Sequence, residues 1–124
     1  MKIAFFSTYL FGGAGSSARS VVSVLREKGH SVHLYYRFGV TPQSHEHCLD
    51  FWYSNDQINK TMSIGVKNLF YHTSEETCVK WTQIERTMEE KPDVILLFWY
   101  AQMLSPELIQ QLYIVYKCPI VLFM

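Results

Sequence analysis

The chain has 124 residues, a length that suits one domain with a real hydrophobic core. Hydrophobic residues make up 48% of it and charged residues 18%, so the composition predicts a folded protein rather than a disordered one. Eleven basic residues balance eleven acidic residues, which removes any general electrostatic argument for nucleic acid or an acidic membrane as the partner.

Cysteine usage and hydropathy give an expected compartment. Cys48, Cys78 and Cys118 are odd in number and widely spaced, which favours reduced thiols and a cytoplasmic location over a disulfide framework. The longest apolar run, residues 94–101, has eight residues and is too short to cross a bilayer. The sequence therefore predicts no transmembrane segment, while peripheral association of a longer parent protein with a membrane stays open.

The first 29 residues are typical of a strand, a glycine loop and a helix. Residues 3–6 form an unbroken apolar run, as in a parallel strand that is buried on both faces. Glycines between residues 12 and 15 predict a loop, because glycine adopts positive φ freely. A helix is expected to begin at Ser16 or Ser17 and to stop at Gly29. Its apolar stripe consists of Ala18, Val21, Val22 and Leu25.

The start of this helix is a candidate anion site. The first N–H groups of a helix lack partners within it, and the helix dipole makes that end about half a unit charge positive. A glycine loop at this position suits a phosphate, although glycines also serve simply to turn a tight corner. The candidate phosphate-binding residues are Gly12, Gly13, Ala14, Gly15, Ser16 and Ser17.

The same glycines offer an alternative, a dinucleotide-binding domain. Residues 13–18 fit the pattern G-x-G-x-x-G/A. Against it, residues 9–12 separate the expected strand from the motif. The second expected strand, residues 31–37, also ends in Tyr35, Tyr36 and Arg37, where an acidic residue would bind a ribose. Arg37 would suit a 2′-phosphate at most.

The middle of the chain, residues 38–74, has a weak pattern. Residues 49–53 predict a short strand. The run His45-Glu46-His47-Cys48 contains metal-ligating residue types, but no second cluster completes a four-ligand site, so we expect a solvated loop and no metal. His30 and His33 are interpreted as ordinary polar neighbours of the second strand.

The last third of the chain is strongly patterned. Residues 73–91 predict a helix, which a capping box of Thr73 and Glu76 begins. Residues 94–99 show no polar alternation and so predict a central parallel strand. Buried positions of the helix are expected at Cys78, Trp81, Ile84 and Met88.

A second helix is expected after Ser105, Pro106 and Glu107, which stand in the order of a cap, a residue of fixed φ and an acid. Residues 119–124 predict a further buried strand, and the sequence stops inside it. We therefore expect these residues to be the amino-terminal piece of a longer protein. The inner face of the helix is expected to contain Leu108, Ile109, Leu112, Val115 and Tyr116.

Together these elements predict an α/β fold: a Rossmann-like, doubly wound parallel sheet with helices on both faces, formed by residues 1–124 as one truncated domain. Ligands of such sheets bind beyond the carboxyl ends of the strands. We therefore expect residues 7–17 and 99–104 to share one crevice. Its candidate acceptor-binding residues are Ser7, Thr8, Trp99, Tyr100 and Gln102.

Several segments, in this order, resemble the amino-terminal domain of GT-B fold glycosyltransferases of family four. They are Lys-Ile-Ala-Phe-Phe-Ser-Thr at residues 2–8, Gly-Gly-Ala at residues 12–14, Glu-Lys-Gly-His-Ser-Val at residues 27–32, and Lys-Pro-Asp-Val-Ile at residues 91–95 before a strand that ends in Trp99. The likeness spans nearly the whole chain and is least clear over residues 38–74.

This resemblance implies a retaining hexosyltransferase that moves a sugar from a nucleotide-sugar donor to an acceptor, as in polysaccharide biosynthesis, typically without a metal or other cofactor. The acceptor is a glycan, a lipid-linked molecule or a small molecule. In such enzymes this domain holds the acceptor, and a second Rossmann-like domain, absent from these residues, holds the nucleotide. By the same likeness the loop at residues 12–14 closes over the donor phosphates and sugar, and Arg19 is a candidate phosphate contact.

The chain also departs from that family. Leu96 and Phe98 stand where relatives often carry histidines, and the catalytic histidine is expected beyond Met124. No catalytic residue is therefore predicted here, and the fragment alone is expected to be inactive. Loss of a partner lobe would expose apolar surface and favour self-association. A third alternative is a non-catalytic flavodoxin-like interaction domain; a receiver-like domain is disfavoured because the first strand ends at Ser7 and Thr8, without acidic residues.

Overall fold

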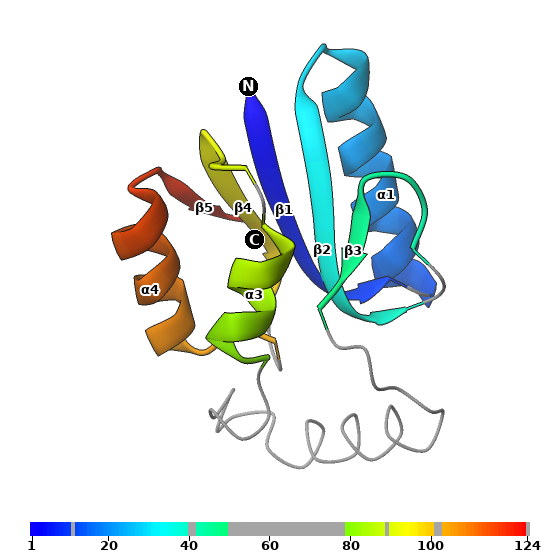
Figure 1. Ribbon diagram of the computed structural model, residues 1–124. Coiled ribbons are helices and arrows are strands. Elements are labelled where there is room, and N and C mark those ends of the chain that lie inside the picture. Colours follow the sequence, from blue (N-terminus) through cyan, green and yellow to red (C-terminus); the bar gives the residue numbers. More distant parts are fainter. Residues whose placement is uncertain (11, 40–41, 50–78, 89, 101–102, 124) are drawn as a thin grey trace.

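A computed structural model describes residues 1–10, 12–39, 42–49, 79–88, 90–100 and 103–123 (Figure 1). Within these residues, five strands form one sheet in the order β3-β2-β1-β4-β5, and every neighbouring pair is parallel. The predicted α/β, Rossmann-like fold is confirmed. The elements are β1 (Lys2–Leu10), α1 (Gly12–Glu27), β2 (Ser31–Gly39), β3 (Glu46–Cys48), α3 (Trp81–Thr87), β4 (Val94–Trp99), α4 (Pro106–Tyr116) and β5 (Ile120–Leu122).

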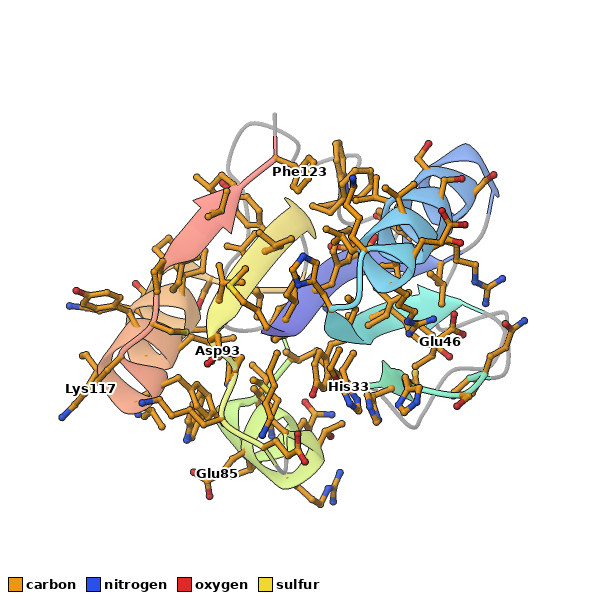
Figure 2. All side chains as sticks on the ribbon, turned by 90° about the horizontal axis from the view of Figure 1, so that it is seen from above. His33, Glu46, Glu85, Asp93, Lys117 and Phe123 are labelled. Carbon is orange, nitrogen blue, oxygen red and sulfur yellow. The ribbon has the colours of Figure 1, made fainter. Side chains whose placement is uncertain are left out.

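Helices cover both faces of the sheet. Viewed from above, α1 lies on one side of the strands, and α3 and α4 lie on the other (Figure 2). Side chains alternate between the faces of a strand, so Phe5 of β1 packs in one cluster with Val22 of α1. Phe6 lies in the opposite cluster with Ile84 of α3 and Leu112 of α4. Burial of each large apolar side chain contributes about 1.5–3 kcal/mol, which is why the apolar strand β1 occupies the centre.

The strand order locates the ligand-binding edge. Strands β2 and β4 flank β1, so the order reverses beside β1, and ligands of such sheets bind at the carboxyl ends of the strands on either side of this point. With β3 next to β2, the order is 3-2-1-4-5, as in dinucleotide-binding domains, and differs from the 2-1-3-4-5 order of flavodoxin-like domains. This order counts against the flavodoxin-like alternative.

The predicted glycine loop is wrong in its boundaries. Strand β1 continues to Leu10, and α1 begins at Gly12, so residues 12–15 belong to the first turn of the helix. The strand extends past the apolar run because the polar side chains that follow find partners. Ser7 Oγ donates to the carbonyl of Tyr9 at 2.9 Å, and Thr8 Oγ1 donates to the carbonyl of Trp99 at 3.1 Å.

The middle of the chain also differs from the prediction. The run predicted as a solvated loop contains the edge strand β3, Glu46–Cys48, which pairs with β2. Leu49, predicted to open a strand, follows β3 and is buried. The rest of that predicted strand, residues 50–53, lies outside the described residues. Local pattern missed β3 because the strand is only three residues long and is stabilised by its neighbours.

Helix α3 is shorter than the predicted helix over residues 73–91. Lys80 is extended, with φ −92° and ψ 150°, and Met88 is extended, with φ −86° and ψ 90°, so the helix is confined to Trp81–Thr87. The predicted capping box and Cys78 lie outside the described residues. Ile84 and Met88 are buried as predicted, and Trp81 is partly buried.

Helix α4 begins as predicted. Ser105 Oγ accepts a hydrogen bond from the Leu108 amide at 3.2 Å, and Pro106 occupies the first turn. Leu112 and Tyr116 are buried, and Leu108 and Ile109 pack against the same cluster. The prediction for Val115 is wrong: it is 45% exposed, because it lies at the margin of the apolar stripe.

The prediction of a buried carboxyl-terminal strand is also wrong. Strand β5 is the last strand of the described sheet and pairs with β4 alone. Val121 is 44% exposed and Leu122 50%. Phe123 is 42% exposed, although its ring lies 5.6 Å from Phe98. Among the described residues, no helix is long and apolar enough to cross a membrane.

Candidate functional site at the carboxyl edge of the sheet

The amino terminus of α1 lies at the carboxyl end of the central strand. Only one residue separates the end of β1 at Leu10 from the first helical residue, Gly12. All six predicted phosphate-binding residues, 12–17, fall within the first two turns of α1, and the first turn contains no acidic residue. Because the first amides of a helix have no helical partner, this end attracts anions. Residues 12–15 thus form the start of a helix instead of the predicted loop, and this end of the helix is still electropositive.

The predicted acceptor-binding residues are only partly accessible. Ser7 and Thr8 are completely buried, and both hydroxyls donate to main-chain carbonyls, so they stabilise the strand ends and present nothing to a ligand. Trp99 is 50% exposed and Tyr100 37%. Gln102 lies outside the described residues. The structure therefore brings the ends of β1 and β4 together as predicted, and of the predicted set it leaves the two aromatic side chains at the surface.

Arg19, predicted as a phosphate contact, has a partner within the chain. Its Nε and Nη2 atoms each donate to the carboxylate of Glu46 at 3.1 Å. The Glu46 side chain is 4% exposed and also accepts from the Gln43 amide at 3.0 Å. The fork-to-fork geometry is a strong form of ion pair. Arg19 therefore joins α1 to β3, a role that no local sequence signal indicates for residues 27 positions apart.

A cavity of about 510 Å³ lies where α3 and α4 begin. It combines an aromatic wall with hydrogen-bonding side chains, a lining that suits a ligand with both polar and apolar surfaces. Trp81 forms part of the wall and is oriented by its Nε1, which donates to Glu85 at 2.8 Å. The lining residues are Val79, Lys80, Trp81, Ser105, Glu107, Leu108 and Gln111. Sequence reasoning missed this cavity because it predicted Trp81 to lie inside a longer helix.

Burial keeps several titratable groups neutral. It raises the pKa of the Tyr9 hydroxyl, with Arg37 opposing the shift, and raises the pKa of the Cys118 thiol. Burial, reinforced by the carboxylate of Glu85, also raises the pKa of Tyr116. These groups are therefore protonated at neutral pH and do not supply a ready nucleophile. No three or more His, Cys, Asp or Glu side chains of the described residues are grouped to hold a metal ion.

The site thus has a parallel α/β sheet, an acid-free helix start at the reversal point and two exposed aromatic side chains. No protein-family model, curated protein or solved structure matches this chain. The class that the structure defines is a Rossmann-like α/β domain, with five parallel strands between two helical layers.

Proposed function

We propose that the chain is the acceptor-side lobe of a retaining GT-B glycosyltransferase that uses a nucleotide-sugar donor. The observation that carries the proposal is the start of α1, which lies at the carboxyl end of β1 without an acidic residue in its first turn. The order of the described strands, with its reversal beside β1, supports a ligand at this edge.

The chemistry of sugar transfer matches this arrangement. When the bond between sugar and diphosphate breaks, negative charge develops on the leaving diphosphate, and fixed N–H groups stabilise that charge without reorganising. The start of α1 offers such groups together with the positive end of the helix dipole. Exposed Trp99 and Tyr100 present flat apolar surface of the kind that packs against a sugar ring.

The proposal divides the enzyme between two lobes. This lobe binds the acceptor and closes over the donor phosphates, and a second lobe binds the nucleotide. This assignment gives no catalytic role to three of the described residues near the edge: Ser7 and Thr8, which are buried, and Arg19, which is paired with Glu46. The 124 residues alone are accordingly expected to be inactive.

The test uses the natural gene product with UDP-, GDP- and ADP-sugars. Supporting results are a second lobe encoded after Met124, with its own glycine loop and a Glu-x7-Glu helix, and release of nucleoside diphosphate with a product of retained anomeric configuration. A gene that ends soon after Met124, or a full-length product that releases no diphosphate from any donor with a broad acceptor mixture, would refute the proposal.

Substitution at Gly13 tests the helix start directly. We expect Gly13→Glu to strengthen α1, because a glycine in a helix costs about 1 kcal/mol relative to alanine and an acid in the first turn adds roughly 0.3–1 kcal/mol. The same carboxylate should repel the donor diphosphate and lower kcat/KM at least tenfold. Gly13→Gln, nearly equal in size and uncharged, is the matched control. Equal activity of the two variants would contradict an anion site here; the measurements are thermal unfolding and donor turnover.

A dinucleotide-binding domain remains the second candidate, and one observation favours it. Because β1 runs to Leu10 and α1 starts at Gly12, the motif at residues 13–18 follows the strand almost directly, as the fingerprint requires. Against this candidate, β2 ends in Arg37, Phe38 and Gly39 without an acidic residue, and Arg37 is 8% exposed. Titration with NAD(H) and NADP(H), followed by nicotinamide fluorescence, distinguishes the two functions, since the glycosyltransferase lobe should bind neither.

A further inference from the structure

Three histidines meet at the β3 edge of the sheet, at a distance from the carboxyl-edge site. His33 lies on β2, His47 lies on β3, and His45 precedes β3. The rings of His33 and His47 are stacked at 5.1 Å, and the ring of His45 meets His33 edge-on at 4.9 Å. Tyr35 stacks on the other side of the group, 5.0 Å from His47.

His33 and His47 share a hydrogen bond between the two strands. His33 Nδ1 and His47 Nε2 are 2.8 Å apart. Such a bond needs an N–H on one ring and a lone pair on the other. It therefore exists when the pair carries no extra proton or one, and it is lost when both rings are protonated, because two N–H groups then face each other.

Strand β3 is short: it pairs with β2 over Glu46, His47 and Cys48, and Cys48 Sγ lies 3.5 Å from the Arg37 carbonyl. It has three residues, and at its ends the Leu34 amide donates to the His45 carbonyl at 2.9 Å and the Leu49 amide to the Tyr36 carbonyl at 2.8 Å. The Arg19–Glu46 pair ties β3 to α1. Loss of one side-chain bond and the appearance of two facing cations would therefore be a large perturbation of this short edge.

Burial and the charged groups around His33 set the pH at which the bond between the two rings is lost. Burial lowers the pKa of His33; His45 and Arg26 lower it further, while Glu90 raises it. A group whose pKa is lowered by folding contributes stability at pH values above its unfolded pKa, about 6.5, and that contribution is lost as the pH falls. Glu90 is itself paired with Lys2, with 3.5 Å between the carboxylate oxygen and Nζ.

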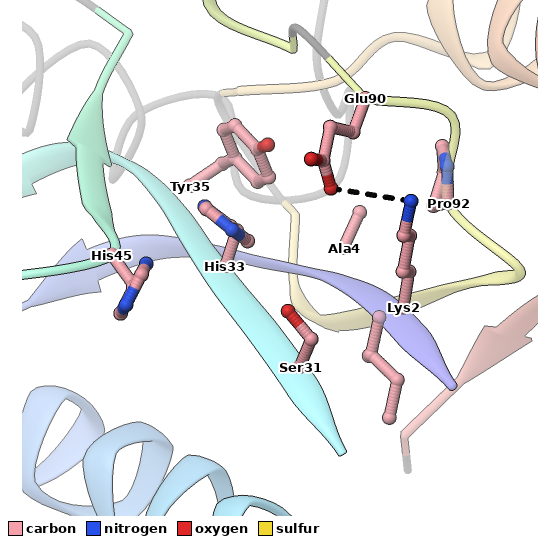
Figure 3. Close-up of a pocket in the computed structure, with 9 residues that line it drawn as sticks. Lys2, Ala4, Ser31, His33, Tyr35, His45, Glu90 and Pro92 are labelled. Carbon is pink, nitrogen blue, oxygen red and sulfur yellow. Dashed lines mark ion pairs between the residues drawn. The ribbon is translucent and has the colours of Figure 1, made fainter.

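A cavity beside His33 gives solvent access to this ring of the pair. It has a volume of about 330 Å³ and is lined on one side by His33, Tyr35 and His45, and on the other by Lys2 and Glu90 (Figure 3). The cavity lets a proton reach the ring without unfolding of the sheet. It also gives the His33 imidazolium room to turn away from His47 toward the Glu90 carboxylate.

We propose that the His33–His47 pair is a proton-operated latch, which holds β3 against β2 when it carries at most one proton and releases that edge when both rings are charged. Release is confined to the β3 side of the sheet. The distant edge, where the Ile95 amide donates to the Pro119 carbonyl at 2.9 Å, contains no histidine among its described residues and does not respond.

Amide hydrogen exchange of the chain between pH 7.5 and 4.5, corrected for intrinsic exchange rates, tests the latch. Opening at Leu34 and Leu49 should increase about tenfold per pH unit once the second proton binds, while opening at Ile95 stays constant. In parallel NMR titrations, the His33 ring should titrate below the ordinary histidine pKa of about 6.5. Constant protection at Leu34 and Leu49 over this range would refute the latch.

Variants separate the latch from general acid sensitivity. His47→Phe keeps an aromatic ring against Tyr35 and removes the second ring that can be protonated, so the pH dependence of opening at Leu34 should weaken to the part that His33 alone contributes. His47→Gln serves if the phenylalanine variant does not fold. His45→Gln should move the transition to higher pH, since a neighbouring cation is removed. His30→Gln is the matched control and should behave as the parent. Retention of the full pH dependence in both His47 variants would overturn the proposal.

Discussion

The two edges of the sheet are stabilised in different ways. At the β3 edge, an Arg19–Glu46 ion pair and a His33–His47 hydrogen bond attach a three-residue strand. At the β5 edge, an equally short strand is apolar, and Val121 and Leu122 are each more than two-fifths exposed. Specific polar contacts thus complete one edge within the described chain, whereas the other edge presents apolar surface.

The two edges differ in how far their side chains protect the edge strand from pairing with another chain. A strand at the edge of a sheet exposes main-chain N–H and C=O groups on one side, and proteins limit aggregation by placing charges or a cover there. The β3 edge carries such groups in Glu46 and the histidines. The three residues of β5 are all apolar, and Lys117 lies at the turn that precedes the strand. The apolar edge is therefore the surface where association with another chain or lobe is expected.

The largest expected effect is at Glu46. Glu46→Gln removes the negative charge and leaves Arg19 only one oxygen to which it can donate. The free energy of unfolding should therefore fall by about 2 kcal/mol. This is less than for a fully buried ion pair, because the Arg19 side chain is about one-third exposed. Urea denaturation measures the change. Glu27→Gln, on the exposed side of α1, is the matched control and should stay within about 0.5 kcal/mol of the parent. An unchanged midpoint for Glu46→Gln would mean that the ion pair does not stabilise the β3 edge.

A smaller effect of opposite sign is expected at the turn before β5. Lys117 adopts the left-handed conformation, with φ 51° and ψ 41°, at the end of α4. Lys117→Gly should raise stability by about 0.5–1 kcal/mol, because glycine adopts positive φ without strain. Thermal unfolding would show a higher midpoint, and Lys117→Ala, which gains no such freedom, should not. A lower midpoint for the glycine variant would show that the stability lost with the lysine side chain is larger than the stability gained by removing backbone strain.

The smallest effect on stability, and the most informative on association, is expected at Leu122. Its side chain is half exposed, so Leu122→Lys should change the free energy of unfolding by less than about 0.5 kcal/mol. The added charge should nevertheless lower the weight-average mass of the chain in sedimentation experiments, because it disfavours pairing of apolar edges. Gln43→Lys, an exposed site near the β3 edge, controls for net charge. Equal masses for the parent and Leu122→Lys would show that the β5 edge does not mediate association.

The sequence by itself predicted the order of β1, α1, β2, α3, β4, α4 and β5, the buried strand β4 and the start of α4 after Ser105, but it missed β3. These features depend on neighbouring residues: an unbroken apolar run, a helical repeat, and a cap followed by proline. They could be predicted because local conformational preference and tertiary packing favour the same answer. The helix start at the carboxyl edge was predicted for the same reason, although its glycines proved to be helical.

Only the tertiary structure determined which polar side chains pair with one another. Arg19 finds Glu46 across 27 positions, and His33 finds His47 across 14, because β3 folds back beside β2. No periodicity indicates such a pairing, since it arises from the path of the chain and not from the preference of any segment. The exposure of β5 and Val115 was set in the same way: an apolar pattern favours burial, but a side chain is buried only where another element lies over it.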